Sequence, residues 1–89
     1  MYFAEIECSY AVADKLATKH GVEVREVEEA VVGAGAYVKR GAGGLYHVWG
    51  RSDAGRYLAI VVRNLGGGQA RLVTARDMTP RERRRHRER

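Results

Sequence analysis

The chain has 89 residues, of which 45% are hydrophobic, and its formal net charge is +5. This length predicts one domain, spanning residues 1–89, with a thin core because a small domain buries only part of its surface. A single cysteine excludes an intrachain disulfide and favours a cytoplasmic protein. The acidic start of the chain does not resemble a signal peptide, and no apolar run approaches the length of a membrane span.

The charge is distributed unevenly along the chain. Residues 1–33 hold three Lys/Arg and seven Asp/Glu, residues 34–78 hold seven and two, and residues 79–89 hold six and two. The amino-terminal third is therefore acidic, whereas the rest is basic. This asymmetry predicts one face for nucleic acid and another for a different contact.

Two helices are predicted near the amino terminus, after a weak strand signal over residues 3–8. Ser9 is a suitable N-cap for the first helix, which Gly21 ends. The second helix covers about residues 23–32, with valines on one face and glutamates on the other. Gly33 follows it and stops the helix.

The middle of the chain predicts an antiparallel sheet of about four strands. The expected strands are residues 36–40, 45–51, 57–62 and 71–76, separated by glycine-rich turns. Residues 52–55 favour a type I turn that a left-handed glycine closes. The strand at 57–62 is apolar on both faces, which predicts a central strand covered on both sides. The fold class is therefore α+β, two helices packed on a small antiparallel sheet with a further helix at the end.

This last helix is the most polar segment of the chain. Thr79 and Glu82 form a capping-box pattern around Pro80, and six arginines follow without a large apolar residue. Such a helix is poorly suited to closing a core and well suited to binding polyphosphate or an acidic protein. The alternative is a solvated tail stabilised by pairs such as Arg84 with Glu88.

Several kinds of site are disfavoured by the sequence. The three histidines lack paired metal-ligand spacing, so we expect no metal and no other cofactor. The glycine-rich loops lack the lysine and the following helix of a phosphate-binding loop. His20 is expected to be an ordinary helix-terminal residue. His47 is expected to face water, with proton transfer as the alternative, and Trp49 is expected to pack in the core or at its rim, with stacking on a base as the alternative.

Arginines at the predicted strand ends remain as candidates for chemistry. RNA cleavage by the 2′-hydroxyl needs a proton acceptor, a proton donor and fixed positive charge on the phosphorane. Arginine supplies that charge, and histidine carries protons near neutral pH. The predicted catalytic residues are Arg51, Arg56, Arg76 and His86. The predicted RNA-binding residues are Tyr57, Arg63, Arg71, Arg81, Arg83 and Arg84. The alternative for each strand-end arginine is solvation or pairing with Asp53 or Asp77.

Three segments together resemble BrnT-type toxins, RelE-like proteins of bacterial type II toxin–antitoxin systems. They are Lys19-His20-Gly21-Val22 before an acidic helix, the run from Gly50 to Leu58, and Arg71-Leu72-Val73-Thr74-Ala75-Arg76 followed by Glu82-Arg83. The chain departs from the family at residues 43–46, where a Glu-Arg pair is missing, and at His86, where a tyrosine is common.

The resemblance implies a RelE-like fold and a metal-independent endoribonuclease that inhibits translation. It also implies two partners, RNA (including ribosome-bound mRNA) and a DNA-binding antitoxin through which the complex would reach DNA. The alternative is a catalytically weakened module of the same fold that binds RNA or an antitoxin through its basic surface. Direct, sequence-specific DNA binding is disfavoured because a helix of arginines has little else with which to read base edges.

Overall fold

The computed structural model describes residues 2–89 as three helices with short helical turns and a five-stranded sheet. The elements in chain order are β1 (Glu5–Glu7), α1 (Tyr10–Lys15), a π-helical turn (Leu16–His20), α2 (Val24–Val32), β2 (Tyr37–Arg40), a 3₁₀ turn (Ala42–Gly44), β3 (Leu45–Arg51), β4 (Tyr57–Gly66), β5 (Gln69–Asp77) and α3 (Pro80–Arg87). This arrangement confirms the α+β class. Within residues 2–89, no helix is both long and apolar enough to cross a membrane.

The strands lie in the order β1-β5-β4-β3-β2, and all neighbours are antiparallel except β1 and β5. The sheet therefore has one strand more than the sequence predicted. The additional strand is β1, which pairs with residues Gln69–Arg71. Its three residues carry too little pattern to predict a parallel partner more than sixty positions away.

Local signals at the ends of the elements act as expected. The Ser9 side chain accepts a hydrogen bond from the Val12 amide, and Thr79 and Glu82 form the predicted capping box of α3. Gly21 ends the first helical segment with φ of 61°, a conformation that glycine adopts without steric cost. In the turn after β3, the Gly55 amide donates to the Ser52 carbonyl with Gly55 at φ of 98°, so the predicted glycine-closed turn is confirmed.

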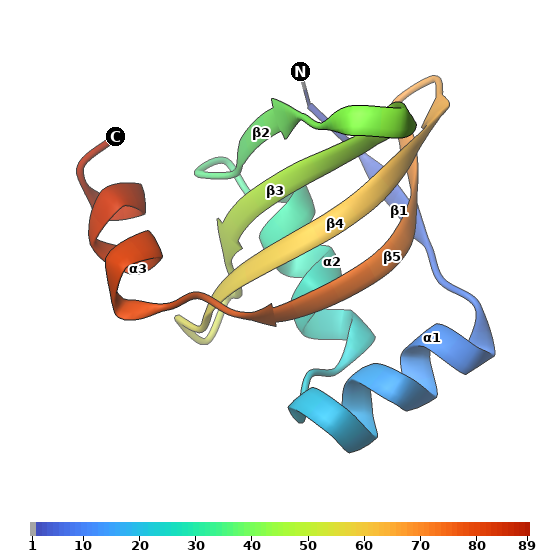
Figure 1. Ribbon diagram of the computed structural model, residues 1–89, viewed down its shortest axis with the longest axis horizontal. Coiled ribbons are helices and arrows are strands. Elements are labelled where there is room, and N and C mark those ends of the chain that lie inside the picture. The colour runs from blue at the N-terminus through green and yellow to red at the C-terminus, as the bar shows by residue number, and fades with distance from the viewer. Residues whose placement is uncertain (1) are drawn as a thin grey trace.

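The helices α1 and α2 cover one face of the sheet, and α3 lies beyond the end of the strands (Figure 1). The core between sheet and helices contains Phe3, Leu16, Val22, Val27, Ala30, Val31, Tyr46, Val48, Leu58, Ile60, Val62, Ala70, Leu72 and Ala75. α3 contributes no buried residue. The core is thus a single layer of side chains between the sheet and the two amino-terminal helices.

Among residues 2–89, no helix packs along the opposite face of the sheet (Figure 1), so the prediction that β4 is covered on both sides is wrong. Ala59 is nevertheless buried. It is the cross-strand partner of Trp49 on one side and of Arg76 on the other, so long neighbouring side chains flank a small one. The outward apolar residues of β4 therefore form the floor of an open surface.

Gly50 permits the closest contact between the sheet and α2. A Cβ atom at this position would lie 2.3 Å from the Ala30 carbonyl oxygen. No side chain shift can relieve this clash because the nearest atoms belong to the helix backbone. The two layers can therefore meet here only at a glycine.

We predict that Gly50→Ala lowers the free energy of unfolding by about 1–3 kcal/mol, the usual cost of overpacking. Urea denaturation followed by the fluorescence of Trp49, the single tryptophan, would measure it. Gly35→Ala is the control because a Cβ there meets nothing within 4 Å. Equal stabilities of the two variants would contradict the assignment.

Candidate nucleic-acid interface

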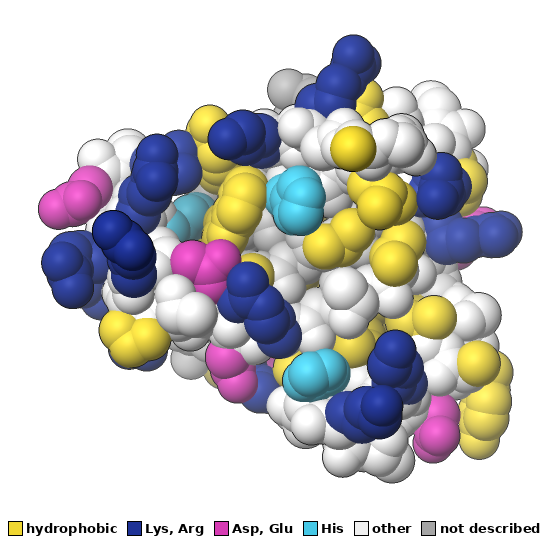
Figure 2. All heavy atoms as spheres, viewed as in Figure 1, with side chains coloured by type: hydrophobic (Ala, Val, Ile, Leu, Met, Phe, Trp, Pro, Cys, Tyr) yellow, Lys and Arg dark blue, Asp and Glu magenta, His cyan; other side chains and the backbone are white. Residues whose placement is uncertain are grey.

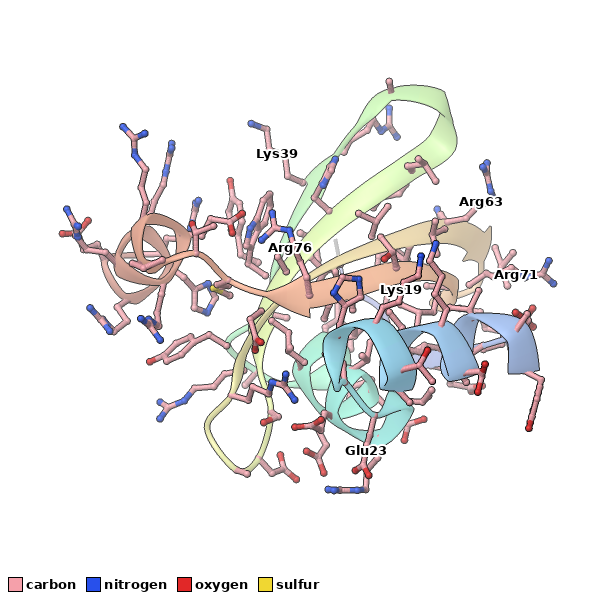
Figure 3. All side chains as sticks on the ribbon, turned by 60° about the horizontal axis from the view of Figure 1, so that its bottom comes forward. Lys19, Glu23, Lys39, Arg63, Arg71 and Arg76 are labelled. Atoms are coloured by element: carbon pink, nitrogen blue, oxygen red, sulfur yellow. The ribbon has the colours of Figure 1, made fainter. Side chains whose placement is uncertain are left out.

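The face of the sheet away from α1 and α2 is called here the open face. Cross-strand pairing places Lys39, His47 and Val61 on it, and Trp49 with Ala59 and Arg76 beside them. Lys and Arg side chains surround this face, while hydrophobic and His side chains lie nearer its middle (Figure 2). Lys39, Arg63 and Arg76 lie on the side of the sheet opposite Glu23 (Figure 3). The acidic and basic parts of the sequence therefore lie on different sides of the sheet, with basic residues of the second part on the open face.

The carboxy-terminal segment contacts the open face through three side chains, Glu82 and His86 of α3 and Arg89, which follows the end of the helix. The spacing of four residues places Glu82 and His86 on one side of the helix. Glu82 accepts a hydrogen bond from Trp49, the His86 ring lies edge-on to Tyr57 at 6.1 Å, and the Arg89 guanidinium lies 3.6 Å from the centre of the Tyr37 ring. α3 is thus held by polar and aromatic contacts.

Glu82 makes the most bonds in this contact. Its Oε1 accepts from Arg76 at 2.6 Å and from the Thr79 amide at 2.9 Å, and its Oε2 accepts from Arg76 at 3.1 Å and from Trp49 at 3.2 Å. The bonds from Arg76 are the main reason that the pKa of Glu82 falls to about 2. The same pairing raises the pKa of Arg76.

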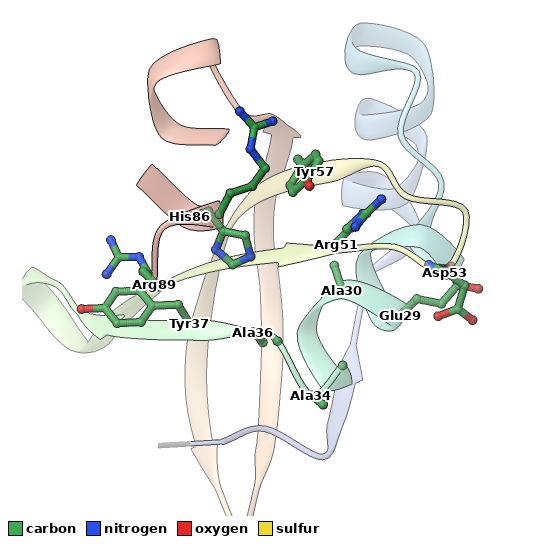
Figure 4. Close-up of a pocket in the computed structure, with 13 residues that line it drawn as sticks. Glu29, Ala30, Ala34, Ala36, Tyr37, Arg51, Asp53, Tyr57, His86 and Arg89 are labelled. Atoms are coloured by element: carbon green, nitrogen blue, oxygen red, sulfur yellow. Dashed lines mark hydrogen bonds between the residues drawn. The ribbon is translucent and has the colours of Figure 1, made fainter. Parts of the chain in front are cut away.

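A depression, called here the His86 pocket, has a volume of about 800 Å³ (Figure 4). It lies at the end of the sheet, where α2, the β3–β4 turn and α3 approach one another. Its lining includes Arg51, Tyr57 and His86, three of the predicted site residues. Its other lining residues are Glu29, Ala30, Gly33, Ala34, Gly35, Ala36, Tyr37, Asp53, Arg87 and Arg89.

Tyr57 links the two polar groups of this pocket. The Arg51 guanidinium lies 4.9 Å from the centre of the Tyr57 ring, and His86 meets that ring edge-on. Burial and then the charge of Arg89 lower the pKa of His86. Nδ1 of His86 is buried without a hydrogen-bond partner among residues 2–89. His86 is therefore mainly neutral at pH 7 and able to accept a proton.

Arg56, a predicted catalytic residue, lies outside this pocket and joins three parts of the fold. Its Nε and Nη2 donate to the two oxygens of Asp77 at 2.7 and 3.0 Å, and its Nη1 donates to Glu26 at 3.1 Å. Nη1 and Nη2 also donate to the carbonyls of Gly21 and His20. These bonds, first those with Asp77, raise its pKa. The geometry fits a scaffold, the alternative considered for each strand-end arginine.

The other predicted arginines are distributed over the surface. Arg63 and Arg71 are cross-strand partners, and Arg71 is bonded to Glu7. The structure does not bring them to the His86 pocket. Arg81, Arg83 and Arg84 are exposed on α3. No ion pair joins Arg84 to Glu88 within the described residues.

A second depression, called here the Trp49 groove, has a volume of about 320 Å³ on the open face. It is lined by His20, His47, Trp49, Ala59, Ile60, Val61, Thr74, Arg76 and Glu82. The sequence singled out Arg76 but not the group, because His20 belongs to the first helical segment, Glu82 belongs to α3, and the others come from three strands. A third, smaller depression includes Lys39 and Arg85. It shares Trp49 and Glu82 with the groove and His86 with the pocket, so the three depressions are neighbours.

Glu29 is another lining residue of the pocket that sequence reasoning missed. Its Oε1 accepts from the Asp53 amide at 3.1 Å, and its Oε2 is paired with Arg25. The pocket thus has an acidic side, with Glu29 and Asp53, and a cationic side. Among residues 2–89, no three His, Cys, Asp or Glu side chains gather in a way that could hold a metal ion.

The fold is similar to that of a known protein. The crystal structure of the Brucella abortus ribonuclease toxin BrnT matches with a TM-score of 0.69, covering 84% of this chain and 96% of that chain. The sequences are 14% identical over the match. No protein-family model matches the sequence, and no curated protein resembles it closely enough to count as a relative. The chain therefore has a BrnT-like fold, as the three sequence segments predicted.

We predict that Glu82→Gln destabilises the protein at pH 7 by about 1–3 kcal/mol, because charged hydrogen bonds are lost. Since folding lowers the pKa of Glu82 to about 2 from an ordinary 4.5, its contribution is full above pH 4.5 and falls as the pH drops toward 2. Urea unfolding at pH 7, 4.5 and 3 would measure a difference from wild type that shrinks with pH.

Glu28→Gln serves as the control because Glu28 is exposed on α2. Its difference from wild type at pH 7 should be small, because its side chain makes no hydrogen bond or ion pair among residues 2–89 that the substitution would remove. A gap between Glu82→Gln and wild type that stays constant from pH 7 to pH 3 would show that the charge of Glu82 does not anchor α3.

Proposed function

We propose that this protein is a toxin of the type II toxin–antitoxin kind, a metal-independent endoribonuclease that inhibits translation. The main support is the meeting of Arg51, Tyr57 and His86, from three separate segments, in the His86 pocket. The similarity of fold to a ribonuclease toxin agrees with it. The proposed partners are RNA and an antitoxin, with DNA reached only through the antitoxin, and the proposed location is the cytoplasm.

In the proposed reaction the 2′-hydroxyl of RNA attacks the adjacent phosphorus. Neutral His86 takes the proton of that hydroxyl as the new phosphorus–oxygen bond forms. Arg51 stabilises the added charge on the phosphorane, and the Tyr57 hydroxyl donates to a phosphate oxygen. The bond to the 5′-oxygen breaks, and this oxygen takes a proton from water. The products are a 2′,3′-cyclic phosphate and a 5′-hydroxyl end.

The remaining predicted residues take supporting roles in this proposal. Arg87 and Arg89, which were not among the predicted residues, place positive charge beside His86. Arg81, Arg83 and Arg84 would bind flanking phosphates from the outer side of α3, and Arg63 and Arg71 from the far end of the sheet. Arg76, engaged by Glu82, would position α3 and contact RNA in the groove. Arg56 would hold the scaffold.

A second candidate is a module that binds RNA or an antitoxin without cleaving. The engagement of Arg56 and Arg76 by carboxylates favours it, because two of the four predicted catalytic side chains already have partners. Growth of cells that express the protein alone distinguishes the candidates. An enzyme arrests growth at low dose, whereas a binding module is tolerated.

We predict that the purified protein cleaves RNA in the presence of EDTA and leaves cyclic phosphate ends. His86→Ala should slow cleavage about 10²- to 10⁴-fold and Arg51→Ala about 10²- to 10³-fold, since they remove the base and the stabilising charge. Gel analysis with and without ribosomes would measure these rates. Lys15→Ala, which removes an exposed cation of α1, is the control and should cleave normally. Absence of cleavage by wild type under both conditions would leave only the binding module.

We predict further that cleavage requires the neutral form of His86. Because the pKa of His86 lies below its ordinary value of 6.5, the rate should already be level at pH 7 and fall as the pH drops through that pKa. Single-turnover rates between pH 4.5 and 8 would test this. An acidic limb that persists unchanged in His86→Ala would assign the base to another group.

A further inference from the structure

The outward face of β4 carries apolar residues that the proposed reaction does not use. Ala59 and Val61 form the floor of the Trp49 groove together with Thr74 of β5. The first helical segment supplies His20 at the margin of the groove, and β3 supplies an aromatic wall. A small apolar floor beside an aromatic wall accommodates a flat group that is itself partly apolar.

The aromatic wall is a row of rings in contact. The His47 and Trp49 rings are stacked, with an interplanar angle of 22° and centres 5.8 Å apart, and Tyr37 meets Trp49 at 5.9 Å. Such rings bind unpaired bases of any sequence because every base has a π face. The bond from the Trp49 ring nitrogen to Glu82 fixes the orientation of the platform.

The surroundings of the groove carry positive charge. Lys39 is the cross-strand partner of His47, and Lys39 and Arg85 line the neighbouring depression, whereas Arg76, which lines the groove itself, is paired with Glu82. Glu82 is the acidic residue in the groove, and the bonds from Arg76, Thr79 and Trp49 already occupy both of its oxygens. This balance of charge favours a polyanion over an acidic peptide with apolar anchors.

The position of the groove relates it to the proposed reaction. The depression lined by Lys39 and Arg85 shares lining residues with both the groove and the His86 pocket, so the two sites are neighbours on the surface. A nucleic-acid strand whose phosphate occupies the pocket can therefore continue across α3 with a neighbouring base over Trp49. A double helix cannot do so, because its bases are paired and stacked.

We propose that the Trp49 groove binds an unpaired nucleobase of single-stranded RNA, stacked on Trp49 and His47, beside the phosphate held in the His86 pocket. This inference rests on the proposed action on RNA. In this proposal the open face selects single-stranded RNA, and the reaction takes place in the His86 pocket. Trp49 and His47 are binding residues, and Glu82 is a positioning residue.

The test uses a 2′-O-methyl uridine octamer, which the proposed reaction cannot cleave because its 2′-oxygen is blocked. Titration into the wild-type chain should quench the fluorescence of Trp49. A fully abasic octamer of the same length should bind about 5- to 100-fold more weakly, because base–aromatic stacking is lost. Trp49→Ala should weaken binding of the uridine octamer by a similar factor, measured by fluorescence anisotropy of a labelled octamer.

Two further variants separate stacking from a misplaced α3. His47→Ala leaves the bond between Trp49 and Glu82 intact and should still weaken binding several-fold. Tyr10→Ala is the matched control, because Tyr10 is an aromatic residue that is 89% exposed on α1, and it should bind as wild type does. Equal binding of the uridine and abasic octamers would overturn the inference, as would unchanged Trp49 fluorescence.

The outcome also separates this inference from the proposed catalysis. Quenching by the uridine octamer without any cleavage of RNA would contradict the enzyme and support the groove. Cleavage of RNA without quenching, and with equal binding of the abasic octamer, would support the enzyme and contradict the groove. Displacement of the octamer by polyglutamate at equal charge concentration would assign the groove to an acidic protein and overturn the inference.

Discussion

Both proposed sites depend on the hydrogen bonds that the carboxylate of Glu82 accepts. Because α3 buries no residue, the hydrophobic effect contributes little to holding it, and a polar anchor must set its position. Glu82 supplies that anchor by accepting from Arg76, Trp49 and the helix's own first turn. The same bonds bring His86 to the pocket and fix the ring of Trp49 in the groove. A single charged residue thus couples the helix to two sites on the sheet.

Arg56 has the corresponding role in the other half of the molecule. It ties the end of the first helical segment and Glu26 of α2 to Asp77 at the end of β5. Both anchors follow from the size of the chain, since a thin core leaves the ends of its elements unsecured. An arginine at a strand end can bind a phosphate or a carboxylate equally well, since its planar fork matches both. Its sequence position alone could not decide between substrate and scaffold.

What could be predicted from the sequence depended on interactions between near neighbours. The caps at Ser9 and Thr79 and the turn that ends at Gly55 are local, so their residues identify them. The parallel pairing of β1 is long-range, and three residues carry no signal for it. The apolar outer face of β4 was misread because periodicity reports polarity without saying what covers a residue. The Trp49 groove was not predicted because its residues lie far apart in the sequence and come together only in the folded chain.

The two proposed sites differ in the interaction by which each would bind RNA. In the groove, Glu82 neutralises Arg76, so positive charge there is weaker than the sequence suggests and the stacked rings provide the main attraction. In the pocket, Arg87 of α3 and Arg89 make no ion pair among residues 2–89, while Glu29 and Asp53 occupy the other side. In the proposed complex, a phosphate would therefore lie toward Arg51 and His86 and away from α2. Stacking would place the strand and charge would place the phosphate, so the carboxylates of α2 would limit where RNA can lie as much as the arginines attract it.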